Sequence, residues 1–398
     1  MICKITKKRI KPFMSFGKMP IANGFIAKKD FKKEFFFKME VGFSKNVSLF
    51  QLNEHPKPHQ MFNKNYPFFT SSSKGMVNHF KEYSSWVKKN FKKDLKYLIE
   101  IGSNDGTFLK NFDKKKTRLI GFEPSKNVAQ ISSKKGIKTI NKFFNYKNVK
   151  KLKYLKKKVN VIAAANAICH IPDLTNLIKG IDFLLADKGI FVFEEPYLGS
   201  MLAKTSYDQI YDEHIFMFSA TSIKKIFSLF NLELINAIPQ KTHGGSMRYV
   251  ICRKGVYKEK ISLKKILKKE KSKNLDNIKC CLEFKKKCEI SKNRLIQKLK
   301  NFKKKNYKIA GYAATSKSTT ILNYCKIGTN YIDYISDTTK EKIGKFSPGM
   351  HIPIVSMKHF QKNLPDRAFL FAWNHKNEIL NKEKKFKKRG KWFAHVNI

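Results

Sequence analysis

The chain has 398 residues, of which 42% are hydrophobic and 13% aromatic. This composition excludes a disordered chain, and the length allows two or three domains with their own cores. Lys and Arg number 83 against 30 Asp and Glu, a formal net charge of +53. Such a charge first indicates a polyanionic partner such as nucleic acid. Because the lysines are spread along the whole chain and arginine is scarce, we expect solvated faces rather than one binding patch.

Seven cysteines occur, and no two of them have CxxC spacing, so we expect no disulfide framework. The first residues, MICKITKKRIKPFMSFG, lack the continuous apolar run of a signal peptide. No stretch approaches the ~18 apolar residues of a membrane-spanning helix. We therefore expect a cytoplasmic protein without membrane insertion. The oligomeric state is left open, with a monomer as the default.

The pattern along the chain divides it into blocks. Residues 1–72 are turn-rich, with several prolines and short apolar pieces such as FFFKMEVGF. Residues 73–256 alternate short apolar runs with helical patterns, which is typical of a parallel sheet with crossover helices. The strands predicted in this block are 97–101, 118–123, 159–165, 189–195 and 248–253.

The remaining third of the chain predicts a helical connector and a second α/β unit. Residues 257–306 are Lys-rich and hold no Pro or Gly, and their apolar residues recur at helical spacing. We expect one or two long amphipathic helices there. In residues 307–398, the runs KIAGYAA, YIDYISD, IPIV and AFLFAW predict short strands. The predicted fold class is therefore α/β.

The segment YLIEIGSNDGTFLKNF predicts a ligand pocket. An apolar strand ends near Glu100, a turn holds Gly102 and Gly106, and an amphipathic helix is expected to follow. Glycines in such a turn let the backbone pass close to a ligand. Glu123 ends the next predicted strand, 21 residues after Gly102, where an acid can accept both hydroxyls of a ribose.

This turn differs from a dinucleotide-binding fingerprint. Its pattern is GxxxG, and Asp105 would repel a pyrophosphate. An acid there suits a ligand with an ammonium and a sulfonium group, which favours S-adenosylmethionine (SAM) over NAD. The alternative is a tight turn with a surface Asp and an unrelated Glu. The predicted SAM-binding residues are Glu100, Gly102, Ser103, Asp105, Gly106, Glu123 and Asn166.

Two further segments place polar side chains near this pocket. VIAAANAICHIPDL sets Asn166 and His170 just past a predicted strand, where ligands bind in open α/β sheets. QIYDEHIFMFS sets Tyr211, Asp212, Glu213 and His214 side by side before an apolar run. The alternative for this second segment is a helix end with solvated charges.

The chain resembles the SAM-dependent sugar C-methyltransferases that act on nucleotide-linked 4-keto-6-deoxyhexoses. The resemblance runs through GKMPIANGF, MFNKNYPFFTSSS, EIGSNDGTFLKNF, GFEPSKNVA, IPDL, IYDEH, HGGSMRYV, GYAATSKSTTILNYCKIG and SPGMHIPIV. It implies a small N-terminal zinc-type module, a central Rossmann-like class I SAM methyltransferase domain, and a C-terminal Rossmann-like domain that helps hold the nucleotide-sugar. The implied ranges are 1–72, 73–256, a connector at 257–306, and 307–398.

The resemblance also implies the chemistry. A methyl group passes from SAM to a carbon, C3 in our prediction, beside the ketone of the sugar. His214 is then the general base, and Glu213 orients it or stabilises its protonated form. Tyr211 and His170 donate hydrogen bonds to the enolate oxygen. We expect Asp212 to be exposed and without a role.

Substrate binding is implied for three other segments. An aromatic at Tyr66 is expected near the sugar, and Asn166 positions SAM or the sugar. Glycines and basic residues in THGGSMRYV can approach an anion, and GYAATSKSTT has the features of a diphosphate cradle at a helix start. The predicted substrate-binding residues are Tyr66, His243, Gly244, Arg248, Ser316 and Lys317.

The N-terminal module departs from the family, which has two CxxC pairs there. Cys3 is present, but Thr6, Ser44 and Val47 stand at the other three cysteine positions. Because one thiolate cannot hold a structural zinc, we predict no metal. Packing of aromatic residues and docking on the central domain must then hold this module.

The sequence does not tell which nucleotide-sugar is used, what stereochemistry results, or whether the product enters a surface polysaccharide or a secreted metabolite.

Three other functions stay open. An O- or N-methyltransferase on a related sugar would need no enolate. A nucleic-acid-binding protein would be indicated by charge alone. A degenerate scaffold would be indicated by the lost cysteines, although the chain keeps Glu100, Glu123 and the cluster at 211–214.

Overall fold

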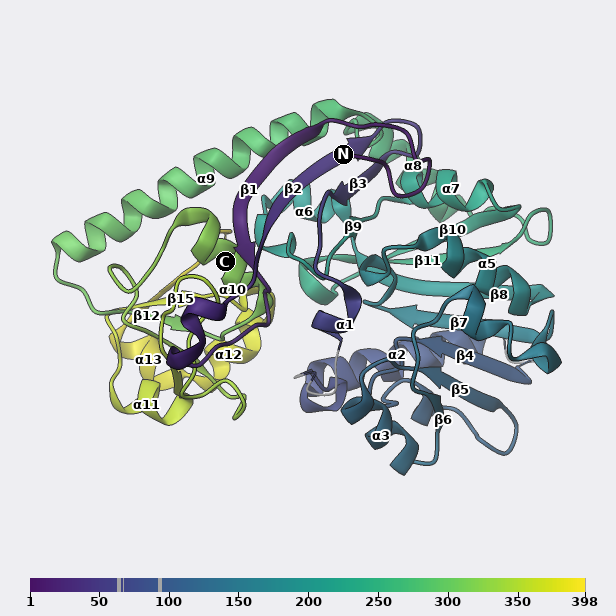
Figure 1. Ribbon diagram of the computed structural model, residues 1–398, viewed down its shortest axis with the longest axis horizontal. Helices are drawn as coiled ribbons and strands as arrows, with labels where there is room; N and C mark the ends of the chain where they lie inside the picture. The colour runs from purple at the N-terminus through teal and green to yellow at the C-terminus, as the bar shows by residue number, and fades with distance from the viewer. Residues whose placement is uncertain (63–65, 67, 92–94, 398) are drawn as a thin grey trace.

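The computed structural model describes residues 1–62, 66, 68–91 and 95–397. Three sheets of four, seven and five strands organise the chain. Figure 1 places the seven-stranded sheet on one side and the five-stranded sheet on the other. The long strands β1 (Pro12–Pro20) and β2 (Phe36–Ser44) run from one side toward the other, and helix α9 (Ile278–Lys304) spans the top.

The N-terminal sheet is antiparallel and takes its last strand from the central block. Its order is β1-β2-β3-β9, and β3 pairs with β9 through Phe50 opposite Met217. β1 is an edge strand, so the prolines at its two ends, Pro12 and Pro20, remove no hydrogen bond that the sheet needs. The module therefore docks on the central block, as expected. Its elements are β1 (Pro12–Pro20), β2 (Phe36–Ser44), β3 (Leu49–Leu52), α1 (Pro58–Met61) and β9 (Phe216–Met217).

The central sheet has the order β10-β11-β8-β7-β4-β5-β6. β11 is antiparallel to both neighbours, and the pairs from β8 to β6 are parallel. All five strands predicted in this block are confirmed. They could be predicted because strands buried on both faces appear in the sequence as continuous apolar segments. The strands are β4 (Tyr97–Ile101), β5 (Arg118–Phe122), β6 (Lys138–Ile140), β7 (Val159–Ala165), β8 (Leu185–Pro196), β10 (Leu232–Gln240) and β11 (Ser246–Arg253).

Helices cover the faces of this sheet, but the predicted helix after the glycine turn is wrong. Between β4 and β5 the chain forms one short 3-10 helix, Leu109–Asn111. The Asn111 amide donates to the carbonyl oxygens of Thr107 and Phe108, which competes with continued helical bonding. The helices of the block are α2 (Lys74–Phe91), α3 (Lys126–Lys134), α4 (Tyr146–Val149), α5 (Leu174–Leu184), α6 (Leu198–Lys204) and α7 (Ala220–Ser228).

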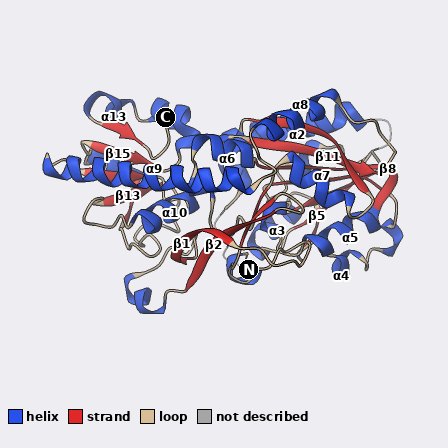
Figure 2. Ribbon diagram, turned by 90° about the horizontal axis from the view of Figure 1, so that it is seen from above, coloured by secondary structure: helices blue, strands red, loops and turns tan. Residues whose placement is uncertain are grey.

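The predicted connector is two helices, α8 (Ile261–Ser272) and α9 (Ile278–Lys304). Figure 2 shows α9 lying along the molecule above the C-terminal unit. That unit is an all-parallel sheet of order β14-β13-β12-β15-β16 with helices around it, as predicted. Its elements are β12 (Ile309–Tyr312), α10 (Ser316–Cys325), β13 (Tyr334–Asp337), β14 (Ile354–Ser356), α11 (Met357–Lys362), β15 (Arg367–Leu370), α12 (Lys376–Lys382), α13 (Lys384–Arg389) and β16 (Lys391–Phe393).

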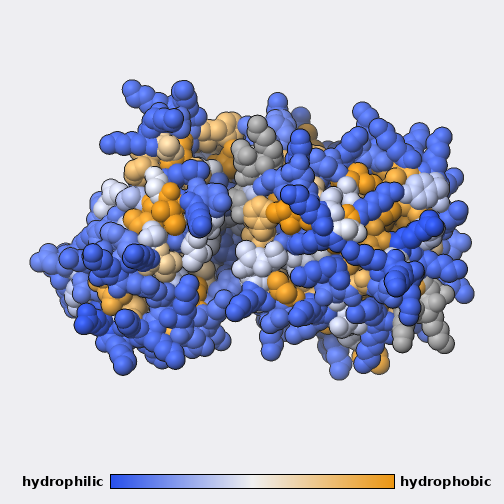
Figure 3. Space-filling view, turned by 90° about the horizontal axis from the view of Figure 1, so that it is seen from below, coloured by the Kyte–Doolittle hydropathy of each residue, from blue (hydrophilic) through white to orange (hydrophobic). Residues whose placement is uncertain are grey.

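The surface is dominated by polar side chains. Figure 3 shows a face that is mostly hydrophilic, with small apolar groups and a hollow between the two halves of the molecule. In the described part of the chain, no helix combines the length and apolar character needed to cross a bilayer.

Candidate active site

One cavity of about 860 Å³ collects most of the predicted site residues. It opens at the carboxyl ends of β4, β5 and β7, the edge where open α/β sheets bind ligands. Its walls come from the N-terminal module, the central block and the C-terminal unit together. The predicted residues that line it are Tyr66, Glu100, Gly102, Ser103, Glu123, Asn166, His170, Tyr211, Glu213, His214, His243, Ser316 and Lys317.

Two buried carboxylates lie on the sheet side of the cavity. Burial raises the pKa of Glu100 well above its usual value, and its Oε2 has no hydrogen-bond partner among the described residues. Burial also raises the pKa of Glu123. Glu123 accepts hydrogen bonds from the backbone N–H groups of Ser125 at 2.7 Å and Asn104 at 3.0 Å. These bonds fix the carboxylate, and each oxygen keeps a further lone pair for a ligand.

The glycine turn and the end of β7 complete this side. Gly102 has φ +69°, and a Cβ there would lie 2.6 Å from the Cβ of Ala167, so the turn requires glycine. Ser103 Oγ and Asn166 Oδ1 are buried and lack a hydrogen-bond partner within the described ranges. Unsatisfied buried polar atoms are costly, so a bound ligand with hydroxyl and ammonium groups would satisfy them. SAM carries both kinds of group, and the residues present fit it.

Asp105 and Gly106, two predicted SAM contacts, do not line the cavity. Asp105 is fully buried and accepts hydrogen bonds from Thr107 Oγ1 at 2.6 Å and the Ser71 N–H at 3.1 Å. Lys135 Nζ lies 3.4 Å from the same carboxylate. A Cβ on Gly106 would lie 2.5 Å from Ile137 Cδ1. The acid therefore holds the turn against neighbouring segments, and the glycine allows close packing.

His214 sits in the loop between β9 and the 3-10 helix Tyr207–Gln209. Its Nδ1 lies 2.7 Å from the Gln209 carbonyl oxygen, so Nδ1 carries the hydrogen and Nε2 keeps the lone pair. The Tyr211 hydroxyl lies 2.7 Å from Nε2 and donates to it. Burial, reinforced by His170, lowers the pKa of His214 well below its usual value. The ring is therefore neutral at physiological pH.

Glu213 is held by the N-terminal module. Asn23 Nδ2 donates to Glu213 Oε1 at 2.8 Å. Burial raises the pKa of Glu213 to about 7, and the Asn23 bond opposes that rise. Asn23 was not predicted as a site residue, although it lies in the family segment GKMPIANGF.

The prediction that Asp212 is exposed is wrong, since its exposed fraction is 1%. Its Oδ1 accepts the backbone N–H of Ala22 at 3.1 Å. The Ala22 carbonyl in turn accepts the Thr319 hydroxyl of α10 at 2.8 Å. The segment around residue 22 thus covers the cluster and links it to the C-terminal unit, which no local pattern in the sequence could reveal.

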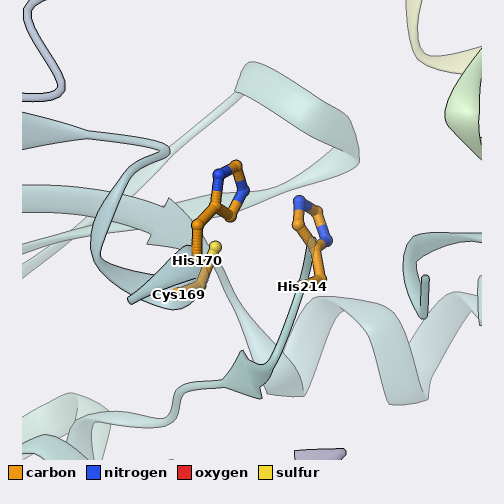
Figure 4. Close-up of side chains that lie close together, drawn as sticks. All are labelled: Cys169, His170 and His214. Carbon is orange, nitrogen blue, oxygen red and sulfur yellow. The ribbon is translucent and has the colours of Figure 1, made fainter. Parts of the chain in front are cut away.

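His170 lies in the 3-10 helix Ile168–His170 at the end of β7. Its ring stacks on His214 with 5.3 Å between centroids, as Figure 4 shows from the side. Burial lowers the pKa of His170 to about 4. Glu195 Oε1 accepts the N–H groups of Ala167, Ile168 and Cys169 at 3.0, 2.6 and 3.2 Å, which fixes this helix. Glu195 was missed, although an acid at the end of a buried strand was a usable signal.

The C-terminal unit contributes cationic groups to the cavity. Lys317, near the start of α10, donates to Asn374 Oδ1 at 3.1 Å and lies 4.8 Å from the centre of the Trp373 ring. Burial lowers the pKa of Lys317. Burial and then Lys317 lower the pKa of His243 to about 3. The prediction missed six cavity-lining residues of this unit: Thr315, Thr339, Lys342, Ala372, Asn374 and His375.

Gly244 and Tyr66, two predicted substrate-binding residues, lie in different places: Tyr66 lines the cavity, whereas Gly244 packs against Trp373. A Cβ on Gly244 would lie 2.2 Å from Trp373, so only glycine allows this approach. Tyr66 lines the cavity, and its ring lies 5.5 Å from that of Phe62. The other residues of the same predicted segment at 63–65 and 67 lie outside the described residues.

Arg248, a predicted substrate-binding residue, is buried against Glu194. Its exposed fraction is 4%, and it does not line the cavity. The guanidinium pairs with Glu194 Oε1 through Nε at 2.6 Å and a terminal nitrogen at 2.5 Å. Its charge also lies between the rings of Tyr83 and Trp86, at 4.4 and 4.8 Å. In the sequence, Arg248 lies close after a pair of glycines, which indicated contact with an anion. In the structure, its side chain is buried against Glu194, Tyr83 and Trp86.

The N-terminal module brings the four former cysteine positions together but does not fit zinc. Cys3 is buried, accepts the Thr6 N–H at 3.4 Å, and lies beside Ser44. Val47 packs in the same core cluster as Cys3. One thiol, two hydroxyls and an isopropyl group are not the ligand set of a structural zinc site, which needs four sulfur or nitrogen donors. No step of the chemistry below involves zinc.

Comparison with known proteins agrees with this architecture. Residues 241–396 match the domain described as "C-methyltransferase C-terminal domain", residues 77–237 match "Methyltransferase domain", and residues 2–62 match "Putative zinc binding domain". The chain is 27% identical over 380 residues to the C-methyltransferase NovU of Streptomyces niveus, covering 95% of this chain and 90% of that protein.

Solved structures resemble part of the chain. The PH0226 protein of Pyrococcus horikoshii OT3 has a TM-score of 0.39 at 13% identity, over 50% of this chain and all of that one. The magnesium protoporphyrin IX methyltransferase of Synechocystis PCC 6803, with bound SAM, has a TM-score of 0.33 at 12% identity, over 45% and 80%. These scores are too low for an inference on function. The domain matches and the full-length relative support a SAM-dependent methyltransferase that is similar to the C-methyltransferases.

Proposed function

We propose that the protein transfers a methyl group from SAM to C3 of a nucleotide-diphospho-4-keto-6-deoxysugar. The observation that carries this proposal is the single cavity shared by carboxylates, a pair of histidines and a lysine. Glu123 can accept hydrogen bonds from ribose hydroxyls, His214 can remove a proton from a carbon beside a ketone, and Lys317 can pair with a diphosphate. The proposed reaction needs all three groups, and all three line the same cavity of about 860 Å³.

SAM, when bound, supplies an electrophilic methyl group. Glu123 would accept hydrogen bonds from the ribose hydroxyls, since its backbone bonds already fix its orientation. Glu100, Ser103 and Asn166 would pair their unsatisfied oxygen atoms with the polar groups of the cofactor. Because Gly102 has no side chain, the backbone of the turn can lie close to the bound cofactor.

His214 acts as the general base. Its Nε2 takes the proton from the carbon beside the ketone, that C–H bond breaks, and its electron pair delocalises into an enolate. The Gln209 carbonyl oxygen keeps Nδ1 protonated, so only Nε2 can accept this proton. Glu213, which titrates near neutral pH, stabilises the imidazolium that forms. The enolate carbon would then form the new C–C bond with the methyl group while the methyl–sulfur bond of SAM breaks, its electron pair staying on the sulfur of S-adenosylhomocysteine.

Tyr211 and His170 stabilise the enolate oxygen. Without substrate, the Tyr211 hydroxyl donates to the base nitrogen. When the substrate C–H bond takes that position, the hydroxyl is free to donate to the ketone oxygen instead. His170 Nε2 has no partner among the described residues, and as an N–H tautomer it would be a second donor. Stabilising the negative charge where it develops lowers the barrier to deprotonation.

The C-terminal unit would hold the nucleotide diphosphate. Ser316 and Lys317 stand at the start of the ten-residue helix α10, where N–H groups and the helix dipole favour an anion. Lys342 and His243 also line the cavity. Tyr66 offers an aromatic surface for the sugar ring.

A mass measurement tests the proposal. The purified chain is incubated with SAM and a panel of nucleotide-linked 4-keto-6-deoxysugars that carry deuterium on the carbon beside the ketone. We expect one sugar to gain a methyl group and lose that deuterium. A methyl gain with the deuterium retained would show transfer to oxygen or nitrogen and contradict the enolate route. No methyl gain on any sugar, with SAM bound, would contradict the substrate class.

A further inference from the structure

Cys169, His170 and His214 form a cluster at the edge of the cavity. One thiol sulfur and one nitrogen from each imidazole lie within 4.8 Å of one another. Figure 4 shows the two rings side by side, with the Cys169 sulfur close to the base of His170. The first two residues follow β7 and the third precedes β9, so sequence spacing gives no sign of the cluster. The chemistry proposed above uses neither the thiol nor the combination of the three groups.

The spacing of these donors is near that of a zinc site. Zn–S and Zn–N bonds of about 2.3 and 2.0–2.1 Å in tetrahedral geometry put the donors roughly 3.3–3.6 Å apart. The separations here, at most 4.8 Å, must therefore close by about 1.5 Å or less. His170 and His214 line the cavity, which gives a metal ion an entry path and leaves a fourth coordination position for water.

The surroundings of the donors also suit a metal. His214 donates its Nδ1 hydrogen to a backbone carbonyl, the arrangement that orients metal-binding histidines. His170 Nε2 is buried and without a partner in the described part of the chain. The Cys169 thiol lies next to the Glu195 carboxylate. A metal ion that binds the sulfur displaces the thiol proton, which is released to the solvent.

We propose that Cys169, His170 and His214 form an inhibitory binding site for a borderline transition-metal dication such as Zn²⁺. One thiolate and two imidazoles are donors that such ions prefer over Mg²⁺ or Ca²⁺. The bound ion occupies the lone pair of His214 Nε2 and displaces the Tyr211 hydroxyl, so the ring can no longer accept a proton. Binding stands on the cluster alone, whereas inhibition rests on the proposed role of His214 as base.

Cobalt binding tests the site without measuring activity. Co²⁺ is added to the full-length chain, and we expect a thiolate-to-cobalt charge-transfer absorption that saturates at one equivalent and is abolished by Zn²⁺. Cys169→Ser should remove this absorption and weaken Zn²⁺ binding by at least about tenfold. Cys252→Ser, at a buried thiol on β11, is the matched control and should keep it. Cys169→Ala is a second variant, and SAM binding checks that each variant is folded.

Absence of the charge-transfer absorption in the unmodified chain, or its persistence in both Cys169 variants, overturns the site. In activity assays, Zn²⁺ should inhibit the unmodified enzyme, and Cys169→Ser should need at least about tenfold more Zn²⁺ for the same inhibition. Cobalt binding without inhibition by Zn²⁺ overturns the inhibitory role and argues against His214 as base. A failure of the sugar substrate proposal leaves the cobalt absorption unchanged, so the two hypotheses fail separately.

Discussion

Asn23 donates a hydrogen bond of 2.8 Å to Glu213 across 190 residues of sequence. The bond joins the N-terminal module to the residue beside the candidate base. The neighbouring pair, Ala22 and Asp212, makes a second bond of 3.1 Å in the same place. A module that has lost its zinc ligands therefore still contributes to the active site.

Removing this hydrogen bond should affect the pH dependence of catalysis. Because the Asn23 bond lowers the pKa of Glu213, Asn23→Ala should raise that pKa above about 7. The ionised carboxylate is the useful form, so activity is lost as pH falls through its pKa, and in the variant the loss begins at a higher pH. We expect about a tenfold lower kcat at neutral pH, the effect of a hydrogen bond to a charged group. The measurement is kcat/KM against pH.

The control for this prediction is Asn53→Ala. Asn53 also donates to a glutamate in the N-terminal module, Glu40 at 3.4 Å, but does not line the cavity. A pH profile that shifts equally in both variants, or in neither, would contradict a specific role for Asn23.

Replacing the candidate base should abolish turnover but not cofactor binding. His214→Gln keeps a polar side chain but removes the proton acceptor, so we expect kcat to fall by about 10²–10⁴. The SAM dissociation constant should stay within about twofold, since His214 is not among the predicted cofactor contacts. His359→Gln, at the exposed helix α11, is the matched control. Wild-type turnover in His214→Gln would eliminate this residue as the base.

The ribose assignment predicts a binding defect at Glu123. Glu123→Gln keeps the shape of the side chain but loses the charge that accepts two hydroxyls. We expect SAM to bind about 10–100-fold more weakly, because hydrogen bonds to charged groups contribute about 1.5–3 kcal/mol. Calorimetric titration with SAM measures this, with Glu259→Gln on the surface as control. An unchanged dissociation constant in a folded variant would contradict the assignment.

Replacing Lys317 should weaken substrate binding, whereas replacing Arg248 should lower the stability of the fold. Lys317→Ala should raise KM for the nucleotide-sugar by about tenfold, since a charge-assisted bond to phosphate contributes about 1.5–3 kcal/mol. Arg248→Ala leaves buried Glu194 with His79 but without its arginine partner, so it should lower the free energy of unfolding by about 3–5 kcal/mol. Steady-state kinetics and urea denaturation of both variants separate the two effects. A KM defect in Arg248→Ala without loss of stability would reverse our correction.

The former zinc position should be restorable. All variants carry Cys169→Ser, which weakens the zinc site proposed in the cavity. Thr6→Cys, Ser44→Cys and Val47→Cys together with Cys3 then recreate a four-thiolate set, so we expect this variant to bind one Zn²⁺ tightly and to melt at a higher temperature with it. Thr6→Cys alone in the same background is the control and should not retain zinc. The melting temperature of the Cys169→Ser chain should be insensitive to a chelator. Stoichiometric zinc at Cys3 in the unmodified protein would contradict the misfit described above.

Local patterns predicted the strands and the ends where ligands bind. The runs at 97–101 and 159–165 are mostly buried, and short apolar runs of this kind are typical of interior strands. Glu100, Glu123 and His170 reach one cavity because parallel strands bring their carboxyl ends to the same edge. These are consequences of periodicity and chain direction, which the sequence itself contains.

Spacing failed where a side chain faces a partner from a distant segment. Asp105 was predicted to contact the cofactor, but its carboxylate accepts hydrogen bonds from Ser71 and Thr107. Asp212 was predicted to be exposed, but it is buried and accepts a hydrogen bond from the backbone of Ala22. Arg248 lies on the inward side of β11, a direction fixed by strand register rather than by neighbouring residues.

The amino-acid sequence by itself determined the α/β fold, the cofactor edge of the sheet and the Tyr211–His214 cluster, because each depends on residues close together in the chain. Only the tertiary structure decided that Asn23 supports Glu213 and that Cys169 lies beside the two histidines. The physical reason is that hydrogen bonds and metal-binding geometry depend on distances in space. Sequence separation does not encode those distances once the chain has folded into three packed units.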